Sequence, residues 1–168
     1  MATAEISALI TRLTEARATL DHVLDHVGDQ WDVQVYSDGA QWTALQVLRH
    51  LAISDQAISN NIKIIAGGQE AIPADFDLER YNRRSVEKNS TMTVEAARAQ
   101  LNTTRAAFLE WLGTLDDASL AKEGRHPMFQ VISVRDHLKI MGRHEANHAH
   151  EIAAVCTIPE LPKTTGQP

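Results

Sequence analysis

The sequence predicts an all-α fold, a bundle of four long amphipathic helices. Its 168 residues suit one domain. Four stretches carry apolar residues at steps of three and four, which is the period of one helix face, and no stretch has a convincing strand pattern. We therefore expect a single domain over residues 1–158 and a flexible C-terminal tail over residues 159–168, which holds three prolines and a glycine.

The first expected helix runs from Ala4 to Val27, where Gly28 is placed to end it. The next segment, from Asp29 to Trp42, alternates apolar and polar residues in its first half, which would allow a short strand. Because this segment is isolated between helices, we expect a connecting loop instead.

The second expected helix begins at Thr43. Thr43 and Gln46 have the spacing of a capping box, in which the two side chains satisfy free amides at the helix start. The pair Gly67-Gly68 marks the end of this helix. After a linker, a charged stretch over residues 78–88 has a helical pattern.

The third and fourth expected helices lie in the second half of the chain. One runs from Thr93 to Leu112, and the other from Ser133, which has capping-box spacing with Asp136, to Cys156. Between them we expect a loop region over residues 113–132, with two glycines and a proline. The connections after the second and third helices are long enough for a crossover.

Composition and charge exclude several classes of protein. The chain has 16 basic and 22 acidic residues and a net charge of −6, which argues against binding to nucleic acid or to an anionic membrane surface. Its one cysteine, Cys156, excludes an intramolecular disulfide framework and any multi-cysteine zinc site. We find neither a signal peptide nor an apolar stretch of membrane-spanning length, so we expect a cytoplasmic protein.

Three of the eight histidines have positions that indicate a metal site. His144 and His148 are four residues apart, so their side chains lie one above the other on one helix face. His50 lies beside the apolar line of the second helix and is expected to point into the bundle or next to its core. Helical bundles build metal sites from inward-facing side chains on different helices.

Other histidines fit a plainer interpretation. His22 and His26 are also four residues apart, but the aspartates around them indicate a solvated helix end. His150 is two residues past His148 and therefore faces away from it. We expect these three to be bystanders.

The stretch from His144 to His148 also reads as H-E-x-x-H, the motif in which zinc proteases use two histidines as ligands and the glutamate as general base. The extended motif requires glycine and histidine at positions where this chain has Glu151 and Ala154. A protease is therefore a weak alternative.

Two segments resemble motifs of a known family. The stretch Trp42–Ala52, WTALQVLRHLA, is similar to W-x-x-x-x-x-L-x-H-L, and His144–Ile152, HEANHAHEI, is similar to H-x-x-x-H-x-x-Q-I. Both motifs are typical of the DinB/YfiT-like family of metalloenzymes, which this chain therefore resembles. Phe76–Arg84 and Gly124–Pro127 also resemble segments of some members, so the resemblance covers nearly the whole chain in order.

The resemblance implies a four-helix bundle of up-down-down-up order, often a homodimer. It also implies a divalent metal ion, zinc or nickel among others, on three histidines that map onto His50, His144 and His148. Some relatives are thiol transferases that use bacillithiol or mycothiol, and one branch isomerises maleylpyruvate with mycothiol. This chain departs from a common pattern by having Asn147 where a histidine often stands and Glu151 where glutamine is frequent.

Three neutral histidines leave the charge of a divalent ion uncancelled and at least one coordination position open, as in catalytic sites. Such an ion can lower the pKa of a bound water to about 7, which leads to hydrolysis, or hold a thiol as thiolate, which leads to thiol transfer to an electrophile. The three histidine ligands alone do not determine which of these two reactions takes place on a small-molecule substrate. A metal-containing binding or dimerisation module without turnover is a third alternative.

Glu151 is a candidate catalytic residue. It lies three residues after His148 and seven after His144, so it roughly shares their helix face. It can accept a proton, or orient a ligand histidine by a hydrogen bond. The plainer interpretation is a partly exposed helix glutamate.

Four residues are candidates for lining the pocket. His137 lies seven residues before His144, on the same face but about 10 Å along the axis, too far to join the metal ligands. His126, in the expected loop before the last helix, can fold over the site. Tyr81 and Asn82 are candidates for the pocket rim.

Overall fold

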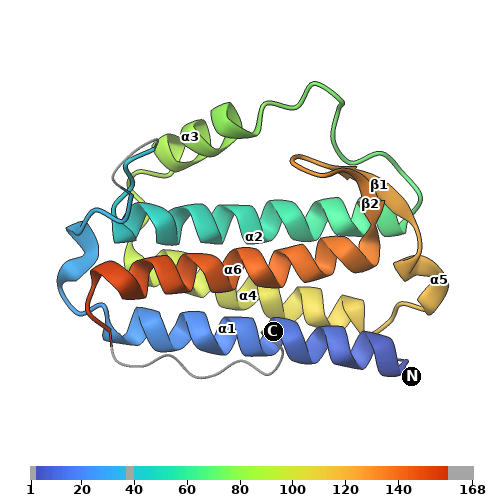
Figure 1. Ribbon diagram of the computed structural model, residues 1–168, viewed down its shortest axis with the longest axis horizontal. Helices are drawn as coiled ribbons and strands as arrows, with labels where there is room; N and C mark the ends of the chain where they lie inside the picture. Colours follow the sequence, from blue (N-terminus) through green and yellow to red (C-terminus); the bar gives the residue numbers. More distant parts are fainter. Residues whose placement is uncertain (1–2, 37–39, 159–168) are drawn as a thin grey trace.

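Four long helices lie side by side in the computed structural model, which describes residues 3–36 and 40–158 (Figure 1). The tail predicted over residues 159–168 lies outside the described residues. The four are α1 (Ala4–His26), α2 (Ala44–Ala66), α4 (Val94–Leu112) and α6 (Val134–Val155). Helix α3 (Leu78–Lys88) is part of the connection between α2 and α4, and the 3₁₀ turn η1 (Gln30–Asp32) follows α1.

The helix directions give the order of the bundle. Helices α1 and α6 run in one direction and α2 and α4 in the opposite direction (Figure 1), which is the expected up-down-down-up order. Helix α1 packs against α6, and α2 packs against both α4 and α6. The all-α bundle predicted from the sequence is confirmed.

Local chemistry fixes where the helices begin. The Thr43 hydroxyl accepts a hydrogen bond from the Gln46 amide, and the Gln46 side chain accepts one from the Thr43 amide, so the predicted capping box is present. Thr93 and Ser133 cap α4 and α6 through their hydroxyls. These caps set the helix starts and with them the direction in which each later side chain points.

The loop region expected after α4 is partly wrong. It holds the short helix α5 (Asp117–Leu120) and an antiparallel hairpin of β1 (Glu123–His126) and β2 (Gln130–Ser133). Gly124 lets this hairpin lie on the end of α2, because a Cβ atom there would be 2.4 Å from the Ile65 Cγ1 atom. Strands of four residues are too short to show a pattern in the sequence.

The segment between α1 and α2 contains, in its described part, η1 and an isolated bridge between Gln34 and Thr43. A connecting loop was expected there, and the described residues agree. Among the described residues, no helix combines the length and apolar character needed to cross a membrane.

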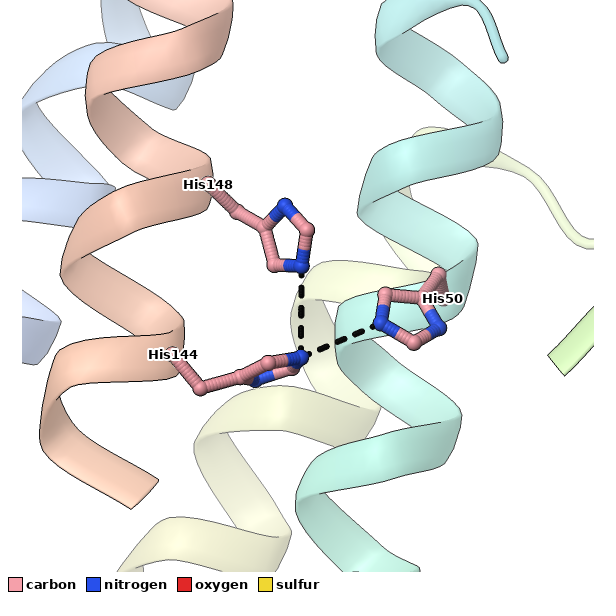
Figure 2. Close-up of side chains that lie close together, drawn as sticks. All are labelled: His50, His144 and His148. Atoms are coloured by element: carbon pink, nitrogen blue, oxygen red, sulfur yellow. Dashed lines mark hydrogen bonds between the residues drawn. The ribbon is translucent and has the colours of Figure 1, made fainter. Parts of the chain in front are cut away.

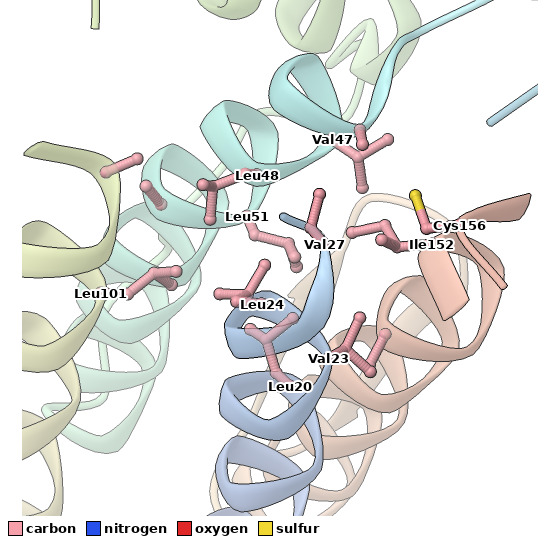
Figure 3. Packing of buried hydrophobic residues seen from close by; sticks show 14 residues of the cluster. Leu20, Val23, Leu24, Val27, Val47, Leu48, Leu51, Leu101, Ile152 and Cys156 are labelled. Atoms are coloured by element: carbon pink, nitrogen blue, oxygen red, sulfur yellow. The ribbon is translucent and has the colours of Figure 1, made fainter. Parts of the chain in front are cut away.

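The bundle interior has two apolar clusters. One fills the end near the α1–α2 connection and contains Leu20, Leu48, Leu101 and Ile152 (Figure 3). The other fills the end near the hairpin and contains Leu13, Ile62, Phe108 and Met141. Cys156 belongs to the first cluster and is 1% exposed.

A layer of charge separates the two clusters. Each long helix contributes one buried residue to it: Arg17, Asp55, Arg105 and Glu145. Each arginine contacts both acids at distances from 2.6 to 3.5 Å, so the two positive and two negative charges balance. Taking charged groups out of water costs free energy, and the attraction between these paired charges offsets that cost.

Candidate metal centre

Three imidazoles meet between α2 and α6 (Figure 2). His50 reaches across from α2, and His144 and His148 stand one turn apart on α6. The His144 Nε2 atom lies 3.1 Å from the His50 Nε2 atom and 3.2 Å from the His148 Nε2 atom. The structure therefore brings together the three histidines that the sequence singles out as metal ligands.

This spacing fits a single divalent ion. An ion bound at 2.0–2.1 Å to three nitrogens in tetrahedral geometry holds those nitrogens about 3.3 Å apart. The two measured Nε2 separations are within a few tenths of an ångström of that value. The residues present can hold the ion with small side-chain movements.

The three histidines are in the form that binds metal. Burial, and then the nearby His148, lower the pKa of His50 to about 3. Burial also lowers the pKa of His144 well below its usual value and lowers that of His148, where Glu151 opposes the effect. At neutral pH the imidazoles are therefore uncharged, and a neutral imidazole is the ligand form.

A carboxylate and a phenol orient His148 from behind. The His148 Nδ1 atom lies 2.7 Å from Glu151 Oε2, and the Tyr36 hydroxyl donates to the same oxygen at 2.6 Å. A carboxylate can only accept, so the His148 proton is on Nδ1 and the Nε2 lone pair is free. Burial and the contact with Glu151 raise the pKa of Tyr36, which keeps it a donor.

The position of Glu151 bears on its two candidate roles. Its bonded oxygen is on the Nδ1 side of the His148 ring, and Nε2 is on the other side. This position supports the orienting role more than the role of proton acceptor at the metal. Tyr36 was not foreseen, because its partners are more than 100 positions away in the chain.

Glu145 does not face the histidines. One of its oxygens accepts from Arg17 Nε at 2.6 Å and the other from Arg105 Nη1 at 3.0 Å, and the residue is 3% exposed. The glutamate of the H-E-x-x-H pattern is thus bound to two arginines in the bundle interior and is not available to act as a base at the histidines. The protease alternative finds no support in this geometry.

The three histidines line a cavity of about 1110 Å³. Its walls come from α2, α3, α6, the linker before α3 and the hairpin. The candidate pocket residues His126, His137, Tyr81 and Asn82 all line it. Trp42, whose ring centroid lies 5.0 Å from that of His50, lines it as well.

His126 and His137 lie against each other in this cavity, with ring centroids 5.3 Å apart. His126 lies on strand β1 and not in a loop, so the loop expected for it from the sequence is wrong. His22 and His26 contact each other on α1 and do not line the cavity, and His150 is exposed. His26 and His150 are exposed, whereas His22 is only partly exposed and its Nε2 atom is buried without a partner among the described residues, which differs from the solvated position expected for it.

Comparison with known proteins gives the same fold. The family model described as the DinB superfamily matches residues 12–152. A search of curated proteins found no match.

Two solved structures are similar to this chain. The first is YfiT from Bacillus subtilis, described as "a probable metal-dependent hydrolase with an unusual four-helix bundle topology": it is 24% identical, with a TM-score of 0.68 over 94% of this chain and 88% of YfiT. The second is the mycothiol-dependent maleylpyruvate isomerase, at 19% identity and a TM-score of 0.69 over 92% of this chain. This chain spans only 64% of the isomerase, and at these identities the likeness concerns the fold alone.

Proposed function

Because the chain belongs to the DinB superfamily, we propose that it is a metal-dependent enzyme that holds a divalent ion, zinc or nickel, on His50, His144 and His148. The observation that carries this proposal is the convergence of three neutral imidazole nitrogens on the wall of a large cavity. One structural neighbour is described as a metal-dependent hydrolase, which supports it.

A divalent ion held by the three histidines would keep its charge and an open coordination position, and would therefore supply Lewis-acid chemistry toward a bound molecule. The surrounding side chains orient the histidine rings. Glu151 and Tyr36 hold the His148 ring from behind, and Trp42 packs against His50. A small molecule bound in the cavity would lie next to the three nitrogens, because all three histidines line it.

Among the reactions that such a site permits, we favour transfer of a thiol to an electrophile. The chain's only cysteine, Cys156, is buried in an apolar cluster and does not line the cavity, so the thiol would be a small molecule of the bacillithiol or mycothiol type. Pockets for one drug-sized ligand span about 300–1,000 Å³. A cavity of about 1110 Å³ has room for a thiol and a small electrophile together.

The atoms balance in this reaction. A bond forms between the thiol sulfur and an electrophilic carbon, the bond from that carbon to its leaving group breaks with the electron pair, and the thiol proton passes to solvent. The mycothiol dependence described for the second structural neighbour supports a thiol partner.

Hydrolysis is the second candidate, favoured by the description of YfiT. A group that accepts a proton from water beside the metal would assist it. Glu151, the candidate for this task, is engaged by His148 and Tyr36 on the far side of the ring. For this reason we place hydrolysis after thiol transfer.

The metal proposal is tested by elemental analysis after loading with zinc or nickel. We expect about one ion per chain in the wild type and a large loss in His50→Ala and His144→Ala. His150→Ala is the matched control, because this histidine is exposed on the same helix. A wild type that retains no ion, or triad variants that retain as much as the wild type, would overturn the metal site.

The reaction is tested with the metal-loaded protein. Low-molecular-weight thiols are combined with a chloro-nitroaromatic electrophile, aryl esters are offered separately, and products are identified by mass spectrometry. Thioether formation supports thiol transfer, and ester cleavage without it supports hydrolysis. Inactivity with every thiol and ester would indicate a binding module and refute the enzyme proposal.

A further inference from the structure

The cavity continues well past the metal centre, along the groove between α2 and α6. Beyond the triad its walls carry apolar side chains, Ile58 on α2 and Ile140 and Met141 on α6, beside the polar Ser54 and Asn61 of α2. His137 then follows, seven residues from His144 and therefore about 10 Å away along the helix. The cavity thus has the histidine triad at one end, a mainly apolar stretch of α6 beside it, and a second histidine pair, His126 and His137.

His137 presents a hydrogen-bond acceptor that nothing satisfies. Its Nδ1 atom lies 2.9 Å from the Ser133 carbonyl oxygen, which can only accept, so the ring proton is on Nδ1. Its Nε2 atom is directed away from the α6 backbone and has no partner among the described residues, although the residue is only 4% exposed. A buried acceptor without a partner is costly, and a ligand that donates to it would remove that cost.

His126 presents the complementary donor. The Met128 amide donates to His126 Nδ1 at 3.1 Å, so the neutral ring carries its proton on Nε2. Burial, and then the adjacent His137, lower the pKa of His126 to about 4, so the ring is neutral at pH 7. In the described part of the chain the His126 ring makes a hydrogen bond through Nδ1, and none is found for this N–H group.

The two tautomers exclude a second metal site here. A metal ligand must offer a lone pair, and only His137 Nε2 has one free, since the His126 Nδ1 lone pair is engaged by a backbone amide. One donor beside one acceptor instead matches a hydroxyl group, which accepts and donates at the same oxygen. A carboxylate would accept from His126 but face the lone pair of His137.

We propose that His126 and His137 form a recognition subsite for a hydroxyl group of the substrate, with His137 about 10 Å from His144 along the α6 axis. This inference rests on the proposed function, because the subsite is the far end of the same cavity. The substrate class is a small molecule with a metal-binding head, an apolar segment of about eight bonds and a hydroxyl at its end.

The test uses alkyl hydroxamates, whose two oxygens bind zinc, with the zinc-loaded protein and calorimetry as the readout. One probe ends in a hydroxyl eight bonds from the head, and a second of the same length ends in a methyl group. A third and a fourth, each four bonds long, end in a hydroxyl and in a methyl group, and a fifth of the full length ends in a carboxylate. Two new hydrogen bonds predict that the long hydroxyl probe binds about tenfold more tightly than the methyl probe. The short hydroxyl probe gains nothing over its own methyl analogue.

Variants of His126 and His137 test whether the tighter binding of the hydroxyl probe comes from these two residues. His137→Phe keeps a ring and removes the acceptor, and His126→Phe, on the hairpin, removes the donor. Both variants abolish the hydroxyl gain and still bind the methyl probe, whereas the control His150→Phe behaves as the wild type. If His137→Phe does not fold, His126→Phe decides the question alone.

The possible failures are distinguishable. If no hydroxamate binds the zinc-loaded wild type, the metal centre is wrong and the subsite falls with it. If the methyl probe binds and the hydroxyl adds nothing, or the carboxylate probe binds more tightly than the hydroxyl probe, the metal centre stands and the hydroxyl subsite is refuted.

Discussion

Glu145 on α6 accepts a hydrogen bond of 3.0 Å from Arg105 on α4, although its neighbour in sequence, His144, points into the metal cavity. Successive residues of a helix are turned by about 100°, so these two side chains leave α6 in different directions. The charged layer therefore fixes the rotation of α6 about its axis. That rotation directs His144 and His148 toward His50.

Arg105→Met is expected to destabilise the protein strongly. It leaves Asp55 and Glu145 in the interior with only Arg17 for their charges, and breaking a buried ion pair costs roughly 3–5 kcal/mol. Urea unfolding followed by circular dichroism measures the loss. Arg98→Ala is the control on the same helix, because its ion pair with Asp25 is largely exposed and is worth about 1 kcal/mol or less. Equal losses in the two variants would contradict this role for the layer.

The metal triad could be predicted from the sequence and the charged layer could not. His144 and His148 share a helix face by their spacing alone, His50 lies beside the apolar line of its own helix, and the resemblance to a family joins the three as metal ligands. Arg17 and Asp55 are single charged residues in apolar lines, and which residues pair depends on how four helices are aligned along the bundle. The Tyr36 contact and the hairpin also depend on distant segments. The homodimer implied by the resemblance stays a prediction, which a solution mass would check.

Glu151→Ala is expected to weaken zinc binding about 10- to 100-fold, the usual effect of removing a group that orients a ligand histidine. The side chain holds the Nδ1 side of His148, at 2.7 Å. Glu151→Gln retains an oxygen that accepts this hydrogen bond and should keep most of the affinity. Competition with a chromophoric chelator measures all three proteins. If Gln weakens binding as much as Ala, the charge matters more than the hydrogen bond.

The metal-free protein is expected to lose stability as the pH falls from about 6.5 toward 4. His126 has its pKa lowered to about 4 in the fold, by burial and then by His137. In that window the unfolded chain binds a proton at this residue and the folded chain does not, so acid favours unfolding. The free energy of unfolding of wild type and of His126→Asn, measured at pH 7, 6 and 5, tests this. The variant should show the shallower dependence, and an equal or steeper one would contradict it.

Gly124→Ala is expected to destabilise the protein by about 1–3 kcal/mol, the usual cost of overpacking. The added Cβ atom would lie 2.4 Å from Ile65 Cγ1, and Ile65 is fully buried. Gly113→Ala is the control, because the nearest atom to its new Cβ is 3.4 Å away. If the clash is the cause, Ile65→Ala should remove part of the cost of the alanine at position 124. Thermal unfolding of the two single variants and the double variant measures this coupling, and strict additivity would show that the hairpin does not press on α2 at this point.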